Sequence, residues 1–256
     1  MKIIPNIIPA AKIYIALRYL NAHKKQILEG RTTENYEMER DGIRKAIRTW
    51  SRNLLDSFNI KVNITGQENL PKEGPVVFMA NHQGYADIPV CCAALSSIQL
   101  GFVAKEELLK VPLYGEWIMN IRSIPIKRSD PRASLRAINE GIEFIEKGFS
   151  LVVFPEGTRS QGKPHREFKK GSMKLATKPG VPIIPVTING TPAIFEERGI
   201  LTGNKTVDVT IHPPIETKGM SKQEQSELAK RVQEIVQSVL PPELHYVPQE
   251  GSSEEE

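Results

Sequence analysis

A histidine and an aspartate five residues apart follow a short apolar run early in the chain. The run Pro75–Ala80 is typical of a strand, and His82 and Asp87 come after it, separated by Gly84, which permits a sharp turn. Pro89 suits the first turn of a helix, so we expect His82 in a loop and Asp87 at a helix start. A carboxylate on one imidazole nitrogen raises the basicity of the other, so this pair could deprotonate a hydroxyl.

The same spacing has a purely structural interpretation. Asp87 would then cap the helix N-terminus, and His82 would be a loop histidine with satisfied hydrogen bonds. The chain contains no G-x-S-x-G nucleophile elbow, and its two cysteines, Cys91 and Cys92, lie on an apolar helix. Adjacent cysteines cannot close a long loop, which fits a reducing compartment. If His82 is catalytic, direct transfer is favoured over a covalent enzyme intermediate.

A second candidate loop follows the apolar run Ser150–Phe154 and reads Pro-Glu-Gly-Thr-Arg-Ser over residues 155–160. It offers a carboxylate, a hydroxyl, free backbone N–H groups and a guanidinium that can bind a phosphate through two parallel hydrogen bonds. The structural alternative is a salt-bridged surface turn. The composition of this loop is therefore compatible with a phosphate site.

An incomplete nucleotide-binding pattern overlaps this second loop. Residues Gly157–Lys163 spell G-x-x-x-x-G-K, but Pro164 stands where a Ser or Thr should hold Mg²⁺. Because proline has neither a hydroxyl nor an N–H group, we do not expect an NTPase. His165 and His82 lack a recognisable metal-ligand spacing, so the sequence predicts no metal site.

Both loops belong to a segment in which apolar runs alternate with helical patterns. This alternation favours an α/β fold with a mostly parallel central sheet flanked by helices. Ligands of such sheets bind beyond the carboxyl ends of the strands, where both loops lie. The predicted strands are Pro75–Ala80, Leu100–Ala104, Ser123–Ile126, Ser150–Phe154, Ile183–Ile188 and Val207–Ile211. The predicted helices are Ile88–Leu95, Pro112–Asn120, Ala133–Glu146, Gly171–Thr177 and Ser221–Val239.

The positive charge of the chain is concentrated at its N-terminal end. Residues 1–60 contain 11 Lys and Arg against 6 Asp and Glu, out of 34 and 30 in the whole chain. Two amphipathic helices separated near Gly30 are predicted here, the second over Thr33–Phe58. The second has an apolar stripe and a basic row, formed by Tyr36, Ile43, Ile47, Trp50, Leu54 and Phe58 and by Arg44, Arg48 and Arg52. Such helices bind anionic membrane surfaces or pack on a core with solvated basic backs.

Composition and length exclude several classes of protein. With 256 residues, 39% of them hydrophobic, the chain can bury the core of one large domain. No stretch approaches the roughly 20 apolar residues of a spanning helix, and no secretory signal is recognisable. Nucleic-acid binding is not expected, because no zinc-finger, zipper or aromatic single-strand pattern accompanies the charge. We expect a two-helix appendage over 1–59, an α/β domain over 60–240 and a disordered tail over 241–256.

Together the two loops resemble the glycerolipid acyltransferases, in particular the bacterial 1-acylglycerol-3-phosphate acyltransferases. The resemblance covers residues 60–215, and its blocks are Asn81–Asp87, Phe102–Leu108, Val111–Gly115, Ser123–Arg128, Phe154–Ser160, Phe168–Gly171 and Val181–Val186. In one block the usual Asp-Arg ending is replaced by Lys127 and Arg128, so only the arginine carries over.

The resemblance implies a reaction and a role for each site residue. His82 would deprotonate the 2-hydroxyl of the acceptor, oriented by Asp87, and the hydroxyl would attack the thioester of acyl carrier protein or coenzyme A. The product would be phosphatidate, formed without a metal or other cofactor. The residues implied to hold the phosphorylated glycerol are Glu156, Gly157, Thr158 and Arg159, with added charge from Arg128 and Lys105. The oxyanion also needs hydrogen-bond donors, which the sequence does not identify; backbone N–H groups near Gly157 and the Asn81 amide are candidates.

Lipid substrates of this kind imply a protein at a membrane. We therefore expect residues 1–58 to dock on the cytoplasmic side of the cell membrane without spanning it. Two alternatives stay open. One is an acyltransferase for another lysophospholipid or for glycerol 3-phosphate, and the other is a non-catalytic peripheral lipid-binding module.

Overall fold

A seven-stranded sheet forms the centre of the computed structural model, which describes residues 7–127 and 129–248. The strand order is β1-β7-β6-β2-β5-β3-β4, and all neighbours are parallel except β6 and β7. The strands are β1 Ile60–Thr65, β2 Val77–Ala80, β3 Gly101–Lys105, β4 Ile124–Ile126, β5 Leu151–Val153, β6 Ile183–Asn189 and β7 Lys205–Ile211. The predicted fold class, a mostly parallel sheet with flanking helices, is confirmed.

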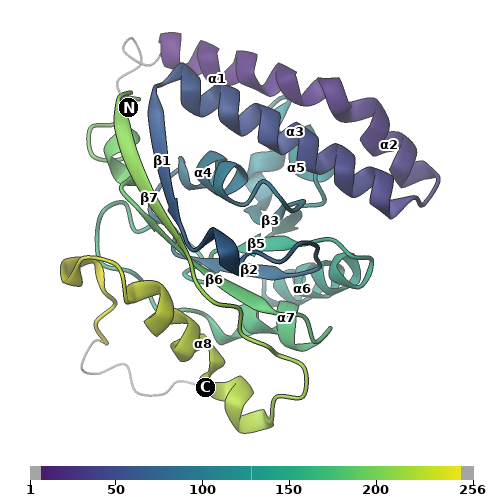
Figure 1. Cartoon of the computed structure of the whole chain (residues 1–256), viewed down its shortest axis with the longest axis vertical. Coiled ribbons are helices and arrows are strands. Elements are labelled where there is room, and N and C mark those ends of the chain that lie inside the picture. The colour runs from purple at the N-terminus through teal and green to yellow at the C-terminus, as the bar shows by residue number, and fades with distance from the viewer. Residues whose placement is uncertain (1–6, 128, 249–256) are drawn as a thin grey trace.

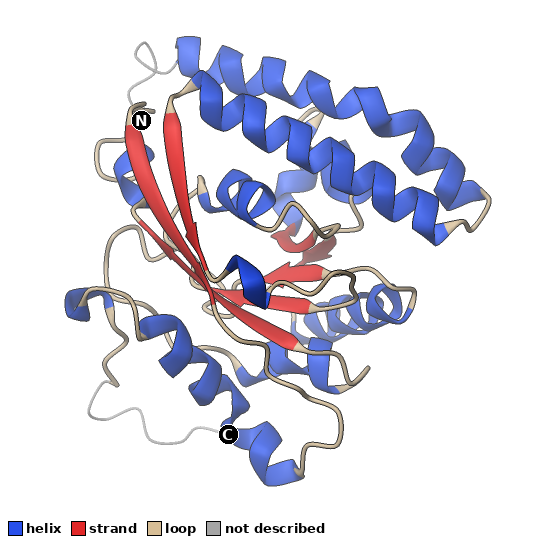
Figure 2. Cartoon of the chain, in the orientation of Figure 1, coloured by secondary structure: helices blue, strands red, loops and turns tan. Residues whose placement is uncertain are grey.

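Two layers of helices cover the two faces of the sheet (Figures 1 and 2). Helices α1 to α5 share one core with the sheet, and α6 to α8 share the other. The α-helices are α1 Ile7–Tyr19, α2 Lys24–Thr32, α3 Tyr36–Ser57, α4 Asp87–Ala94, α5 Tyr114–Asn120, α6 Pro131–Glu146, α7 Lys174–Thr177 and α8 Lys222–Gln237. The short 3-10 helices are Leu20–His23, Gln67–Asn69, Glu106–Lys110, Lys170–Met173, Thr191–Ile194 and Pro242–Leu244.

Strand β1 was not among the predicted strands. Its residues alternate between apolar and polar types, and Ile60 alone among them is buried. The strand pairs with β7 at the edge of the sheet, where alternate side chains of β1 face solvent. An edge strand of this kind lacks the continuous apolar run by which the inner parallel strands are recognised.

The connection between the N-terminal helices α2 and α3 lies later in the chain than the sequence predicts. Gly30 lies inside α2, and α3 begins after Asn35, whose side chain accepts a hydrogen bond from the Met38 N–H group at 3.0 Å. The break predicted near Gly30 therefore exists but lies a few residues later, at residues 33–35. Glycine is required at position 30 for packing, because a Cβ atom would lie 2.6 Å from the Glu39 nitrogen on the neighbouring helix.

The apolar stripe of α3 is buried in the core. Ile43, Ile47 and Trp50 are 0 to 7% exposed, and α3 packs against α1, α2 and α4. In the basic row, Arg44 donates to Asp41 at 2.6 Å, while Arg48 and Arg52 are exposed. The stripe therefore packs on the protein and is not available to a membrane, whereas docking of residues 1–58 stays a prediction.

The tail is ordered further than predicted. Residues 242–244 form a 3-10 helix, and the Leu244 carbonyl accepts a hydrogen bond from the His165 N–H group at 3.0 Å. Disorder is therefore the wrong expectation for 241–248, because this segment pairs with the loop after β5. Residues 249–256 lie outside the described part of the chain. Within 7–127 and 129–248, no helix combines the length and apolar character needed to cross a membrane.

Candidate active site

The two loops singled out in the sequence meet at the carboxyl ends of the inner strands β2 and β5. Strands β2 and β5 are parallel neighbours, so the loops that follow them leave the sheet on the same side. The Ser160 N–H donates to the His82 carbonyl at 2.7 Å, and the Gln161 N–H donates to the Gln83 carbonyl at 3.0 Å. Backbone hydrogen bonds thus join the histidine loop to the arginine loop.

Asp87 is bound to His82 and is fully buried. The distance between His82 Nδ1 and Asp87 Oδ2 is 2.6 Å. The same oxygen accepts from the backbone N–H groups of Gln83 and Gly84, and Oδ1 accepts from the Thr191 hydroxyl at 2.5 Å. Asp87 is the first residue of α4 and its side chain caps no N–H group of that helix, so the capping interpretation is wrong. A carboxylate acceptor at Nδ1 leaves the other ring nitrogen, Nε2, free to accept a proton.

The His82 ring is held on its face as well as at Nδ1. It stacks on Phe154 with centroids 4.1 Å apart and an interplanar angle of 17°. The side chain is 15% exposed, and across the described residues no hydrogen bond engages Nε2. An oriented imidazole with one accessible basic nitrogen has the geometry of a general base for a hydroxyl.

The cysteines next to this pair are not candidates for a nucleophile. Cys91 and Cys92 are both buried on α4. Burial raises the pKa of both thiols, and the Asp87 carboxylate raises the pKa of Cys91 further. Neither side chain is a thiolate near neutral pH, which agrees with direct transfer.

Glu156 accepts hydrogen bonds from backbone N–H groups of both loops. Its carboxylate is buried, Oε1 accepts from the His82 N–H at 2.7 Å, and Oε2 accepts from the Arg166 N–H at 3.0 Å. His165 Nδ1 lies 3.4 Å from Oε1. Contact between Glu156 and the glycerol backbone stays a prediction, whereas its support of the histidine loop is visible in the structure.

Glu156→Gln is expected to destabilise the fold by about 2 kcal/mol, because the two backbone donors point at different carboxylate oxygens. The amide nitrogen that replaces one of these oxygens cannot accept, so one buried N–H loses its partner. Thermal unfolding followed by circular dichroism measures the effect. The exposed neighbour Glu167 supplies the control, since Glu167→Gln should change stability by less than about 0.5 kcal/mol. Equal melting temperatures for both variants would contradict the structural role of Glu156.

Arg159 reaches the histidine loop. Its Cζ atom lies 3.5 Å from the centroid of the Tyr85 ring, and its Nη1 donates to Glu196 Oε1 at 3.0 Å. Lys105 ends β3 and pairs with Glu107 at 3.2 Å, with more than half of its side chain exposed. Arg128 lies outside the described residues. Arg159 therefore contacts the histidine loop at Tyr85, three residues after His82. Lys105 lies at the carboxyl end of another strand.

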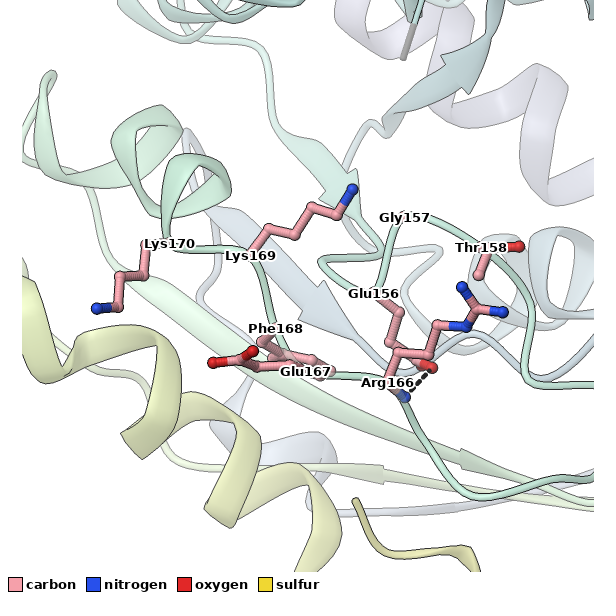
Figure 3. Close-up of a pocket in the computed structure, with 8 residues that line it drawn as sticks. All are labelled: Glu156, Gly157, Thr158, Arg166, Glu167, Phe168, Lys169 and Lys170. Atoms are coloured by element: carbon pink, nitrogen blue, oxygen red, sulfur yellow. Dashed lines mark hydrogen bonds between the residues drawn. The ribbon is translucent and has the colours of Figure 1, made fainter. Parts of the chain in front are cut away.

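A polar hollow of about 490 Å³ opens beside this loop (Figure 3). Its lining consists of Glu156, Gly157, Thr158, Arg166, Glu167, Phe168, Lys169 and Lys170. Gly157 has a φ of +73°, and a Cβ atom on it would lie 3.2 Å from Lys169 Nζ, so the lysine passes close over this glycine. Figure 3 shows Lys169 directed toward Gly157 and Lys170 directed away from it.

An apolar pocket of about 270 Å³ adjoins the hollow, and Gly157 and Lys169 line both. It also contains Phe154, the ring on which His82 stacks. Its apolar wall is formed by Val103, Ile126, Leu135, Ile138, Val153, Phe154 and Leu175. A hollow lined by three cationic side chains and two carboxylates thus lies beside an apolar pocket, and the apolar pocket includes the ring on which His82 stacks.

Two of the suggested oxyanion donors are engaged elsewhere. The Asn81 side-chain amide donates to the Ile188 carbonyl at 2.7 Å and accepts from the Ile188 N–H at 2.7 Å. The Gly157 N–H donates to the Phe154 carbonyl at 3.0 Å. The Asn81 side chain and the Gly157 N–H are therefore the wrong candidates, since both are used to hold the strand ends together.

Sequence reasoning missed the residues that support the pair from the loop after β6. Thr191 binds Asp87, the Gly190 N–H donates to the Gln83 side chain at 3.0 Å, and Glu196 accepts from the Tyr85 N–H at 2.8 Å. They lie over a hundred positions after the residues they hold, so no local spacing marks them. The Gly190-Thr191 pair after a buried strand is the only local signal, because it follows a predicted strand exit.

Several known proteins are similar to this chain. The family described as Acyltransferase matches residues 61–189. A chloroplastic 1-acyl-sn-glycerol-3-phosphate acyltransferase of Arabidopsis thaliana, LPAT1, is 39% identical over 60% of this chain and 44% of its own length. A 1-acyl-sn-glycerol-3-phosphate acyltransferase of Borreliella burgdorferi is 33% identical over 69% of this chain and 70% of its own.

A solved structure is similar over most of both chains. It is the crystal structure of the 1-acyl-sn-glycerophosphate acyltransferase PlsC from Thermotoga maritima, which is 30% identical with a TM-score of 0.69. The match covers 88% of this chain and 92% of that one. By contrast, this chain spans less than half the length of the chloroplastic relatives.

Proposed function

The chain belongs to the acyltransferase family, and on that basis we propose that it acylates the sn-2 hydroxyl of 1-acyl-sn-glycerol 3-phosphate to form phosphatidate. The acyl group would come from a thioester. The observation that carries the proposal is the 2.6 Å contact between His82 Nδ1 and the buried Asp87, beside a loop that supplies Arg159. The names of the relatives support the choice of acceptor.

The reaction follows from the orientation of His82. Nε2 accepts the proton of the acceptor hydroxyl while its oxygen attacks the thioester carbonyl carbon. Asp87, fixed by its other hydrogen bonds, stabilises the imidazolium that forms. The carbon–sulfur bond then breaks, and His82 returns the proton to the departing thiolate. A thioester is already activated, so this sequence of steps does not require a metal.

The phosphate of the acceptor would bind Arg159. A phosphomonoester carries up to two negative charges near neutral pH, and a guanidinium can donate two parallel hydrogen bonds to it. Thr158, the residue before Arg159, and Lys169 line the polar hollow beside this loop and would add a hydroxyl and a second cation. Arg128 and Lys105 stay as further proposed cations, on the resemblance alone.

The apolar pocket would hold the acyl chain of the donor. Phe154, on which the His82 ring stacks, lines this pocket. An acyl chain bound there would therefore place its carboxyl end near the base. The proposed donor is a thioester of acyl carrier protein or coenzyme A, both of which are anionic. Four exposed cations line the two cavities, namely Arg166, Lys169, Lys170 and Lys174. Such a charged rim would attract an anionic donor.

Helix α1 would dock the protein on the cytoplasmic side of a membrane. Its outward-facing apolar residues lie within an arc of about 140° at 100° per residue, and they are Ile7, Ile8, Tyr14, Ile15 and Tyr19, each 47 to 72% exposed. Exposed Arg18 lies within the same arc. This surface, and not the buried stripe of α3, has the apolar and basic character of an interfacial helix.

Replacing Ile8 and Ile15 together by Asp is expected to abolish flotation with liposomes that contain anionic lipid, because two charges would enter the proposed interface. The matched control is Val239→Asp; Val239 is 51% exposed and lies two residues after the end of α8, on the other face of the sheet. That variant should float like the wild type. Undiminished flotation of the double variant would contradict docking by α1.

The proposed function is tested with an acceptor panel. Purified protein is assayed with lysophosphatidate, other lysophospholipids and glycerol 3-phosphate, each with both types of acyl thioester. The expected result is the highest kcat/KM with lysophosphatidate. If only another acceptor is acylated, the protein is an acyltransferase with that acceptor and not with lysophosphatidate. Vesicle binding without any turnover would instead indicate a lipid-binding module.

A further inference from the structure

Glu196 is a buried carboxylate that the proposed mechanism does not use. It follows the 3-10 helix Thr191–Ile194 after β6, and its side chain is 3% exposed. Its Oε1 accepts a hydrogen bond from the Tyr85 backbone N–H at 2.8 Å and another from Arg159 Nη1 at 3.0 Å. One carboxylate oxygen therefore links the loop that carries His82 to the arginine of the second loop.

Arg159 is held from a second direction by an aromatic ring. Its guanidinium stacks on Tyr85, and the Tyr85 ring meets Phe195 edge-on with centroids 5.8 Å apart. A guanidinium has five N–H donors, and Glu196 accepts from one of them. The Arg159 side chain is 24% exposed. The arginine is thus fixed in place while donors are left for an anion.

Gly84 makes room for the Glu196 carboxylate. A Cβ atom on Gly84 would lie 2.6 Å from Glu196 Oε2, so any larger residue would push the carboxylate away from Tyr85 and Arg159. The Oε2 atom is buried and, over the described residues, accepts no hydrogen bond. A buried carboxylate oxygen without a donor is unfavourable for folding, which indicates a role other than stability.

We propose that Glu196 is a positioning residue, which orients Arg159 for the phosphate of the acceptor and fixes that phosphate site relative to His82. This inference rests on the proposed function, in which Arg159 binds the phosphate. A free arginine side chain loses rotamer freedom when it binds an anion, whereas a side chain held in advance has already lost it. Since Tyr85 lies three residues after His82, the same contact sets the spacing between the phosphate site and the base.

A double-mutant cycle between Glu196 and Arg159 tests the proposal. Glu196→Ala should raise the KM for lysophosphatidate roughly tenfold, with kcat little changed, a coupling usual within one hydrogen-bond network. In the Arg159→Ala background the same substitution should add nothing. Glu196→Gln keeps the acceptor oxygen and should restore KM toward the wild-type value. The exposed neighbour supplies the control, since Glu197→Ala should leave KM unchanged.

Equal increases in KM with and without Arg159, or a fall in kcat at unchanged KM, would overturn the proposal, because Glu196 would then act on the fold alone. If the alanine protein does not fold, Glu196→Asp completes the cycle, since it keeps the charge and shortens the side chain. An active wild type whose KM is unaffected by Arg159→Ala would also overturn it. A wild type without turnover of lysophosphatidate would instead overturn the proposed function.

Discussion

His82→Ala is expected to form phosphatidate roughly 10³-fold more slowly than the wild type, within the range for loss of a general base. The ring is partly exposed and stacks on Phe154 at the surface of the site, so its removal should leave the fold intact. Initial rates at saturating donor and acceptor measure the effect. Circular dichroism and liposome flotation on the same samples should match the wild type.

A second histidine supplies the control for this experiment. His23 is half-buried in the N-terminal helical layer, and His23→Ala should retain the wild-type rate. Full turnover by the His82→Ala protein would remove this residue as the base. A lower rate accompanied by lost secondary structure would indicate a folding defect and would contradict the assignment of a local chemical role.

Substitutions of Asp87 are expected to separate catalysis from stability. In Asp87→Asn the amide oxygen should take the position of Oδ2, because two backbone N–H groups and His82 Nδ1 all point there. The amide nitrogen would then face the Thr191 hydroxyl, which can rotate to accept. The protein should therefore fold, while the rate falls about 10²- to 10³-fold, because a neutral amide stabilises the imidazolium less.

Asp87→Ala should lose stability as well as activity. Its removal leaves buried backbone donors unsatisfied, at about 1 to 3 kcal/mol each. Thermal melts of the two Asp87 variants, read beside their rates, provide the comparison. Near wild-type activity in the asparagine protein would show that the charge of Asp87 does not assist His82.

Local spacing predicted the parts of the site that lie within one loop. The contact between His82 and Asp87 follows from a five-residue segment between a strand and a helix, in which Pro89 favours the helical turn. The meeting of the two loops also follows from local patterns, because both leave parallel strands at their carboxyl ends.

Long-range partners could not be predicted in the same way. Thr191 lies 104 positions from Asp87, and Glu196 lies 37 positions from Arg159, so only the folded sheet brings them together. Glu156 was expected to contact the substrate, yet the fold buries its carboxylate, which accepts hydrogen bonds from two backbone N–H groups. A motif identifies side chains that matter without saying whether they contact the substrate or the backbone.

The N-terminal helices illustrate a further limit of the sequence. Helical periodicity correctly predicted an apolar stripe on α3, but periodicity does not tell whether protein or lipid covers it. The structure buries that stripe and exposes α1 instead. Periodicity marks the outward face of α1 less clearly, because this face mixes isoleucine and tyrosine with Arg18.

The central claim, direct attack of a hydroxyl activated by His82 on the thioester, is tested most directly by a single-turnover measurement. Thiol release and phosphatidate formation are followed in the same rapid-mixing samples with excess enzyme. The account predicts one rate constant for both products and no thiol release when lysophosphatidate is omitted. A burst of thiol that precedes phosphatidate, with an acyl group attached to the protein, would contradict it.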